Sequence, residues 1–193
     1  MTDADVTAVV LAGGRSRRFG RDKLVEPIDG RPLLAHAIDA VRPLVSEIVV
    51  VTAPDGRPDV PSGVRVVHDP VAFEGPLVGA RAGIAAASSP VVLLVAGDMP
   101  DLVPAVLASM VAALREADDA VVLEQEDGPR PLPMVVRRDP ALVALDRLIG
   151  GGERRLLALP DALAAKVIAQ STWRALDPDG ATTRDIDTEG DLA

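Results

Sequence analysis

The stretch VTAVVLAGGRSRRFGRDK, residues 6–23, decides the fold that this sequence predicts. Its first six residues form a continuous apolar run rich in β-branched side chains, which is typical of a strand buried on both faces. The run leads into Gly13 and Gly14, and glycines let the backbone turn sharply and approach a ligand without an intervening Cβ. The sequence therefore predicts a buried strand that opens into a tight loop suited to binding a ligand.

Short apolar runs alternate with helical patterns along the rest of the chain. We expect further strands at residues 47–51, 64–67, 91–95, 120–123, 132–136 and 166–169, and helices at 32–41, 77–87, 103–116, 140–149 and 154–159. This alternation indicates an α/β domain with a mostly parallel sheet that is covered on both faces. A length of 193 residues allows one domain with a sizeable core and is short for two, so we expect a single domain over residues 1–193.

Composition excludes several classes of protein. The net charge of −9 argues against nucleic acid or an anionic membrane as the main partner, because both need a basic surface. The chain has no cysteine, which excludes disulfides, zinc–thiolate sites and thiol nucleophiles. Residues 1–5 lack the pattern of a signal peptide, and no apolar run approaches the roughly 20 residues of a membrane helix. We expect a soluble, cytoplasmic protein, as a monomer or a weak homo-oligomer.

The loop after the first strand is strongly cationic. Within it, one acidic residue, Asp22, faces five basic residues: Arg15, Arg17, Arg18, Arg21 and Lys23. A polyphosphate would relieve their mutual repulsion through guanidinium and backbone N–H donors. The alternative is a solvated basic turn, but the position directly after a buried strand favours the ligand. The segment matches neither GxxxxGK[ST] nor GxGxxG, which argues against a P-loop and against a dinucleotide-binding dehydrogenase.

A second candidate site residue, Asp98, follows the apolar run at residues 91–95. Ligands of open α/β sheets bind beyond the carboxyl ends of the strands, which is where Gly13, Gly14 and Asp98 should meet. A carboxylate there can hold Mg²⁺, which neutralises phosphate oxygens during transfer. Alternatively, Asp98 stabilises a turn or caps the helix that begins near Pro104. Asp69, in VVHDP, would by itself be an ordinary turn residue.

Taken together, these segments resemble the family of molybdenum cofactor guanylyltransferase-like NTP transferases. The pattern LAGGxSxRxGxDK at residues 11–23 resembles the family signature, and VAGDMP, VVHDP, GPLVG, the DG…PL segment at 127–132 and GERR resemble further family segments. The resemblance covers nearly the whole chain and is densest at residues 8–36, 64–102 and 126–156. It implies a three-layer, Rossmann-like nucleotidyltransferase fold.

The resemblance also implies an activity: transfer of GMP from GTP to the phosphate of molybdopterin, with release of pyrophosphate and with Mg²⁺ as cofactor. The residues expected to bind the nucleotide are Leu11, Ala12, Gly13, Gly14, Lys23, Asp69 and Asp98. The expected catalytic residues are Lys23, Arg18 and Asp98, of which Asp98 also binds the metal. Thr52 stands near the position of a nucleotide-contacting asparagine of the family, but the residue type differs.

The GGERR segment at residues 151–155 is expected to contact the acceptor. Arg154 and Arg155 are the candidates to hold the acceptor phosphate, on the basis of charge and position. The alternative is a purely structural segment, in which a glycine ends one helix and Glu153 begins the next near its positive end. GERR favours molybdopterin over other acceptors, because it resembles the cofactor guanylyltransferases more than related transferases.

The tail departs from the family pattern. Residues 184–192 read RDIDTEGDL where the family commonly has NxNTPEDL, so Asp185 and Asp187 replace asparagines. Asp187 is a second candidate ligand of the Mg²⁺ on Asp98, and a different acceptor is the alternative. Two other functions stay open: a related transferase that uses CTP or another phosphorylated acceptor, and a nucleotide-binding protein without catalysis. The sequence alone does not reveal the base specificity.

Overall fold

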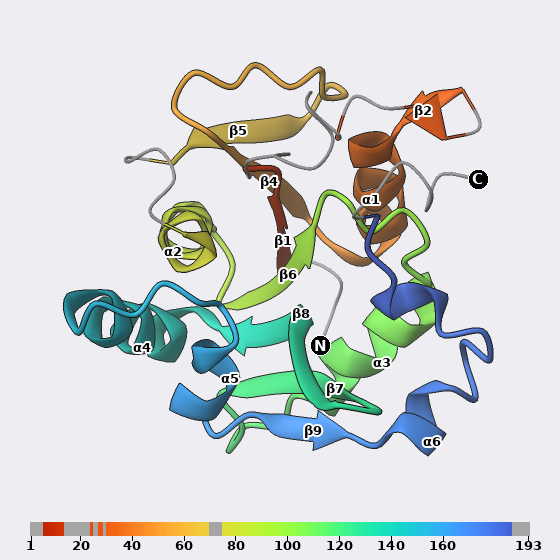
Figure 1. The fold of residues 1–193 in the computed structure, drawn as a ribbon, viewed down its shortest axis with the longest axis vertical. Helices are drawn as coiled ribbons and strands as arrows, with labels where there is room; N and C mark the ends of the chain where they lie inside the picture. Colours follow the sequence, from red (N-terminus) through yellow and green to blue (C-terminus); the bar gives the residue numbers. More distant parts are fainter. Residues whose placement is uncertain (1–5, 14–23, 25–26, 29, 70–74, 187–193) are drawn as a thin grey trace.

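The computed structural model describes residues 6–13, 24, 27–28, 30–69 and 75–186. The largest element is a seven-stranded sheet (Figure 1). Its strands are β1 (Val6–Leu11), β4 (Glu47–Thr52), β5 (Val64–His68), β6 (Val91–Ala96), β7 (Ala120–Gln125), β8 (Gly128–Arg137) and β9 (Lys166–Ile168). They lie in the order β5-β4-β1-β6-β8-β7-β9.

The sheet is mostly parallel, as predicted. β1 pairs in parallel with β4 on one side and with β6 on the other, so that Val9 lies opposite Val49 and Leu94. β4 and β5 are also parallel, as are β7 and β9. Only β8 runs in the opposite direction among these strands, because a tight hairpin joins it to β7 and Gly128 at its start has φ +105°.

Helices cover both faces of the sheet and complete three layers. On one face, the core contains residues of α1 (Leu33–Val41), α3 (Pro104–Ala113) and α6 (Gln170–Trp173). On the other face, the core contains residues of α2 (Pro76–Ala86) and α4 (Arg138–Gly150), together with α5 (Ala158–Ala162). Side chains of β1 alternate between the two cores, with Ala8 and Val10 on the α1 face and Val9 on the α2 face. The fold is therefore the expected three-layer α/β sandwich.

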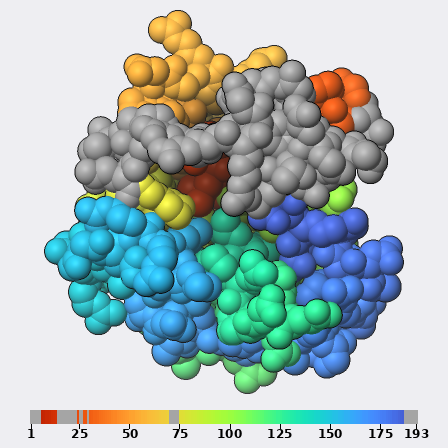
Figure 2. Space-filling view, viewed as in Figure 1, coloured from red at the N-terminus to blue at the C-terminus, as the bar shows by residue number. Residues whose placement is uncertain are grey.

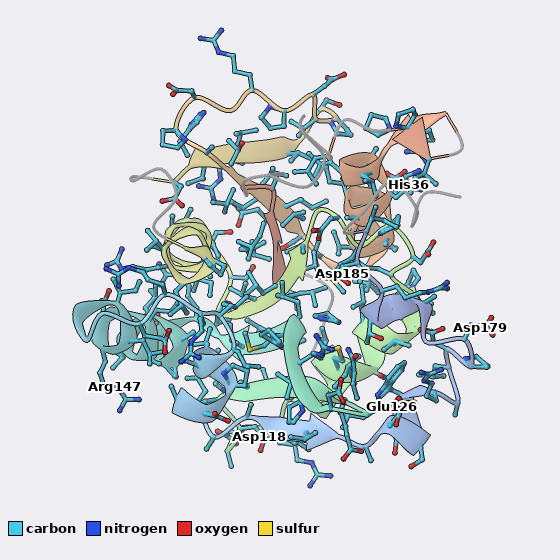
Figure 3. The ribbon with its side chains drawn as sticks, in the orientation of Figure 1. His36, Asp118, Glu126, Arg147, Asp179 and Asp185 are labelled. Atoms are coloured by element: carbon cyan, nitrogen blue, oxygen red, sulfur yellow. The ribbon has the colours of Figure 1, made fainter. Side chains whose placement is uncertain are left out.

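The other described elements are short. They are the hairpin strands β2 (Pro27–Ile28) and β3 (Arg31–Pro32), and the 3-10 turns η3 (Arg42–Leu44) and η4 (Ala181–Thr183). His36 of α1, labelled in Figure 3, lies beside this hairpin with its Nε2 3.0 Å from the carbonyl oxygen of Ile28. Within the described part of the chain, no helix is both long and apolar enough to cross a membrane.

The prediction of a helix at residues 154–159 is wrong, because α5 begins only at Ala158. The carboxylate of Glu153 accepts hydrogen bonds from the backbone N–H groups of Arg154 (2.8 Å) and Arg155 (2.9 Å). These bonds hold the two arginines in a non-helical turn after Gly152, whose φ is +86°.

The helix expected at residues 103–116 also ends earlier, at Ala113. The N–H of Arg115 donates to the carboxylate of Asp118 at 3.0 Å, which stabilises a turn in place of a further helical turn. In the opposite sense, the strand expected at residues 132–136 begins already at Gly128.

Candidate active site

The carboxyl ends of the central strands are joined by hydrogen bonds that continue beyond the strands themselves. The N–H of Ala12 donates to the carbonyl of Val51 at 2.7 Å, and the N–H of Gly97 donates to the carbonyl of Leu11 at 2.9 Å. The start of the glycine-rich loop is therefore fixed between β4 and β6. The exposed Gly13 follows at this edge, where a Cβ placed on it would lie 3.5 Å from the backbone nitrogen of Ala53.

Asp69 reaches the same edge from β5. Its N–H donates to the carbonyl of Thr52 at 2.8 Å, which holds it beside the end of β4. Its side chain extends over α2: a Cβ placed on Gly79 would lie 3.6 Å from the Asp69 Oδ2 and 4.0 Å from the Leu11 Cδ2. The carboxylate of Asp69 and the side chain of Leu11 thus border one small area above Gly79. A Cβ at Gly79 would make ordinary van der Waals contact with both side chains.

Asp98 stands directly after β6 and is half-buried. Its carbonyl oxygen accepts a hydrogen bond from the N–H of Ile186 at 3.0 Å, so the C-terminal segment of the chain lies against the Asp98 loop. Figure 3 labels the neighbouring Asp185 near the end of β6. The structure therefore brings the VAGDMP segment together with Asp185 and Ile186, which are distant from it in sequence.

The surroundings of Asp98 are compatible with one mode of Mg²⁺ binding. Among the residues that the structure describes, no three His, Cys, Asp or Glu side chains form a group that could enclose a metal ion. Mg²⁺ is commonly bound through one or two protein carboxylates, with waters and substrate phosphates as the other ligands. Asp98, at the carboxyl edge of the sheet, fits this mode, and the described residues around it do not form a protein cage for a metal.

The GERR segment packs directly on the GPLVG segment. Gly75, which precedes α2, has φ +103°, and a Cβ placed on it would lie 2.8 Å from the carbonyl oxygen of Arg154. The guanidinium of Arg154 turns inward: its Nη1 donates to the carbonyls of Ile149 at 3.1 Å and Glu153 at 2.8 Å. Arg154 therefore satisfies carbonyls near the end of α4 and fixes the position of the segment beside Gly75.

Arg155 presents its charge to solvent, since 80% of its side chain is exposed. It forms a two-point ion pair with Glu153, with Nε 3.1 Å from Oε1 and Nη2 3.0 Å from Oε2. The hydrogen bonds from the Arg155 side chain, and then those from the backbone N–H groups, lower the pKa of Glu153 to about 2. Of the two arginines expected to hold the acceptor phosphate, Arg155 is the accessible one.

Thr52, near the position where the family has an asparagine, is buried at the end of β4. The residue is 4% exposed, and a Cβ placed on Gly56 would lie 2.1 Å from its Oγ1. The hydroxyl is thus packed against the turn that follows β4. This geometry favours a structural role for Thr52.

Five of the residues expected to bind nucleotide lie along one edge of the sheet: Leu11, Ala12, Gly13, Asp69 and Asp98. Arg154 and Arg155 lie beyond α2, which Arg154 contacts at Gly75. The other expected site residues, Gly14, Arg18, Lys23 and Asp187, lie outside the described residues. Sequence reasoning missed two buried polar residues near Asp98, namely Asp177 and Thr182, although DPDG at 177–180 is a recognisable turn sequence.

A doubly wound sheet with two aspartates at its carboxyl edge is an arrangement in which α/β proteins commonly bind ligands. Residues 8–167 match the model of the MobA-like NTP transferase domain, and the chain belongs to this family. A probable molybdenum cofactor guanylyltransferase of Chloroflexus aggregans is 35% identical over 193 residues, which cover 97% of this chain and 91% of that protein. A molybdenum cofactor guanylyltransferase of Desulfosudis oleivorans is 32% identical over 190 residues, covering 97% and 92%.

A solved structure shows the same fold. The crystal structure of molybdopterin-guanine dinucleotide biosynthesis protein A from Archaeoglobus fulgidus superposes with a TM-score of 0.80 at 23% identity, and the match covers 96% of this chain and 94% of that one. The family resemblance and the three-layer nucleotidyltransferase fold inferred from sequence are therefore confirmed.

Proposed function

We propose that this protein transfers GMP from GTP to the terminal phosphate of molybdopterin and releases pyrophosphate. The observation that carries the proposal is the meeting of Leu11–Gly13, Asp69 and Asp98 at one edge of the sheet, in a chain of the MobA-like NTP transferase family. The names of its relatives, which are molybdenum cofactor guanylyltransferases, support GTP as donor and the molybdenum cofactor as acceptor.

The reaction is a single in-line displacement. An oxygen of the acceptor phosphate forms a bond to the α-phosphorus of GTP, while the bond from that phosphorus to the oxygen bridging to the β-phosphate breaks. The bonding electron pair leaves with pyrophosphate, so no covalent enzyme intermediate is needed. Positioning of the two substrates and neutralisation of developing charge are sufficient for transfer of this kind.

The residues of the first loop act on the triphosphate in this proposal. Gly13 and Gly14 supply backbone N–H groups close to the phosphates, because no Cβ obstructs them. Lys23 and Arg18 stabilise the charge that develops on the departing pyrophosphate. Leu11 and Asp69 border the nucleoside at the area above Gly79.

Asp98 would hold Mg²⁺, with Asp187 as a second candidate ligand. When bound, the cation supplies charge neutralisation at the α-phosphate oxygens. Arg155, exposed beside the start of α2, is our candidate to bind the acceptor phosphate, while Arg154 holds the GERR segment in place. A nucleoside triphosphate as donor fits a reaction in the cytoplasm.

A sibling reaction is the second candidate, and one observation favours it. Asp185 lies beside the Asp98 loop where the family commonly has an asparagine, so this segment carries a carboxylate in place of a neutral amide. Such a charge opposes a phosphorylated acceptor unless a cation is bound. An acceptor other than molybdopterin, or CTP in place of GTP, would then be used.

A panel of triphosphates tests the proposal. The purified protein is incubated with Mg²⁺ and molybdopterin, GTP, CTP, ATP and UTP are compared, and pyrophosphate release is followed. We expect acceptor-dependent release with GTP alone. Release with CTP alone would move the enzyme to the cytidylyl branch, and nucleotide binding without any release would indicate a non-catalytic binder or another acceptor.

A further inference from the structure

The C-terminal segment at residues 177–186, which we call the tail segment, is folded around a buried carboxylate. Asp177 is 4% exposed, and its two oxygens accept hydrogen bonds from the N–H groups of Ala181 (3.0 Å) and Thr182 (2.7 Å). Gly180, with φ +66°, closes the turn by donating to the carbonyl of Asp177 at 3.0 Å. The turn is therefore held in one conformation by an ionised side chain inside the protein.

Thr182 links this turn to the start of α3. It is fully buried, and its Oγ1 accepts a hydrogen bond from the N–H of Val103 at 3.2 Å. Its hydroxyl also interacts with the Asp177 carboxylate. Burial tends to raise the pKa of Asp177, but the hydrogen bonds from Thr182 and Ala181 outweigh it and hold the pKa below its ordinary value. The result is a continuous chain of bonds from Val103 through Thr182 to Asp177.

The tail segment makes a second bond to the same loop. Ile186, at its end, donates its N–H to the carbonyl of Asp98 at 3.0 Å and buries its side chain against Leu33 of α1. Figure 1 shows this blue segment lying against the green start of α3, and Figure 2 shows it beside β8 at the molecular surface. Two hydrogen bonds from one segment thus fix both ends of the loop at residues 98–103.

We propose that the tail segment positions Asp98 for the transfer reaction, with Thr182 as the positioning residue. The inference rests on the proposed function, because Asp98 matters only if it serves the bound triphosphate. Thr182 does not contact the expected substrates; it acts by fixing the backbone that carries Asp98. Loss of its hydroxyl leaves two buried partners, the Val103 N–H and the Asp177 carboxylate, without that hydrogen bond, and the loop relaxes to regain one from water.

Three variants test this inference. Thr182→Val keeps the shape and removes the hydroxyl, whereas Thr182→Ser keeps the hydroxyl. Thr183→Val is the matched control, since Thr183 donates only to Gly180 among the hydrogen bonds seen for its hydroxyl and does not bond to the Asp98 loop. The measurements are hydrogen–deuterium exchange of residues 98–103, the affinity for GTP with and without Mg²⁺, and kcat and KM for transfer.

For Thr182→Val we expect faster exchange at residues 98–103 with unchanged exchange in β1 and β4. We also expect kcat to fall about ten- to a hundredfold, as misplacement of a site residue does, with a smaller change in KM for GTP. The Mg²⁺-dependent part of the GTP affinity should weaken, and the affinity without Mg²⁺ should not. For Thr182→Ser and Thr183→Val, kcat should stay within about twofold of the wild-type value, because both substitutions disturb the loop far less.

Equal losses in Thr182→Ser and Thr182→Val would overturn the inference, as would faster exchange in the loop with an unchanged kcat. Failure of the proposed function looks different: the wild type would bind GTP with Mg²⁺ but release no pyrophosphate. In that case the Mg²⁺-dependent affinity of the variants still decides the inference. A wild type whose GTP affinity is independent of Mg²⁺ would refute it outright.

Discussion

Gly75→Ala is the substitution whose effect the structure defines most closely. Gly75 has φ +103° and ψ 165°, a combination that residues with a Cβ adopt only under strain of about 1–3 kcal/mol. The new Cβ would also lie 2.8 Å from the carbonyl oxygen of Arg154 and 3.0 Å from its Cβ. The carbonyl belongs to a segment held by the Arg154 side chain at Ile149 and Glu153, so it has little freedom to move away. Such an overlap costs about 1–3 kcal/mol more.

A matched control separates the two contributions. Gly128 has φ +105°, and a Cβ placed on it would have no atom within 4 Å. Gly128→Ala therefore also places a Cβ at a positive φ, but without a collision. We expect both variants to be destabilised, and Gly75→Ala to lose about 1–3 kcal/mol more than Gly128→Ala.

The free energies of unfolding are measured by urea denaturation, with the slopes compared to verify that the unfolding transitions are equivalent. Gly75→Ala should also weaken GTP binding, because its Cβ pushes the start of α2 away from the GERR segment. Equal losses of stability in the two variants would refute the reasoning, since the contact with Arg154 would then carry no energy.

Three further predictions concern the site and the opposite edge of the sheet. Lys23→Ala should lower kcat about 10²–10³-fold, the effect of removing one preorganised donor, and normal turnover in a steady-state assay would contradict its assignment. Asp98→Asn should raise the Mg²⁺ concentration that gives the half-maximal rate at least about tenfold. If a Mg²⁺ titration of the variant showed an unshifted midpoint, Asp98 would not be a ligand of the metal. At the start of β4, burial tends to raise the pKa of Glu47, but hydrogen bonds from Ser88, Thr7 and Arg65 lower it to about 2. Because this folded-state pKa is depressed, the stabilisation is complete above the unfolded-state value of about 4.5 and is lost as the pH falls toward 2. At neutral pH, the free energy of unfolding of the wild type should exceed that of Glu47→Gln by about 1–3 kcal/mol. If denaturation curves at pH 3 showed the same difference, the prediction would be contradicted.

The core and the edge that carries the site were predictable from local pattern. The run Val6–Leu11 is apolar except for Thr7 because its residues alternate between two covered faces, and a nearly continuous apolar run of this length is recognisable in the sequence itself. The same reasoning places Gly13 and Asp98 at one edge, because parallel strands end on the same side. The antiparallel direction of β8 was less predictable, because it depends on the tight turn that joins β7 to β8 before Gly128.

Contacts between segments distant in sequence were not predictable from one chain. Nothing in GGERR indicates that the Arg154 carbonyl lies against Gly75, because that contact depends on how α4 and α2 pack side by side on the sheet. Similarly, Thr182 and Asp177 look like ordinary polar residues of a turn until their burial is known. The helix predicted from Arg154 onward was wrong at its start, because the Glu153 carboxylate holds Arg154 and Arg155 in a turn and α5 begins only at Ala158.

Transfer of label from GTP tests the central claim most directly. The protein is incubated with Mg²⁺, molybdopterin and GTP radiolabelled either at the α-phosphate or at the γ-phosphate, and the products are separated. We predict that the α-label appears in a molybdopterin product only when acceptor is present, and that the γ-label appears only in pyrophosphate. Label from the γ-phosphate in the acceptor product, or no transfer of the α-label at all, would contradict nucleotidyl transfer to molybdopterin by this protein.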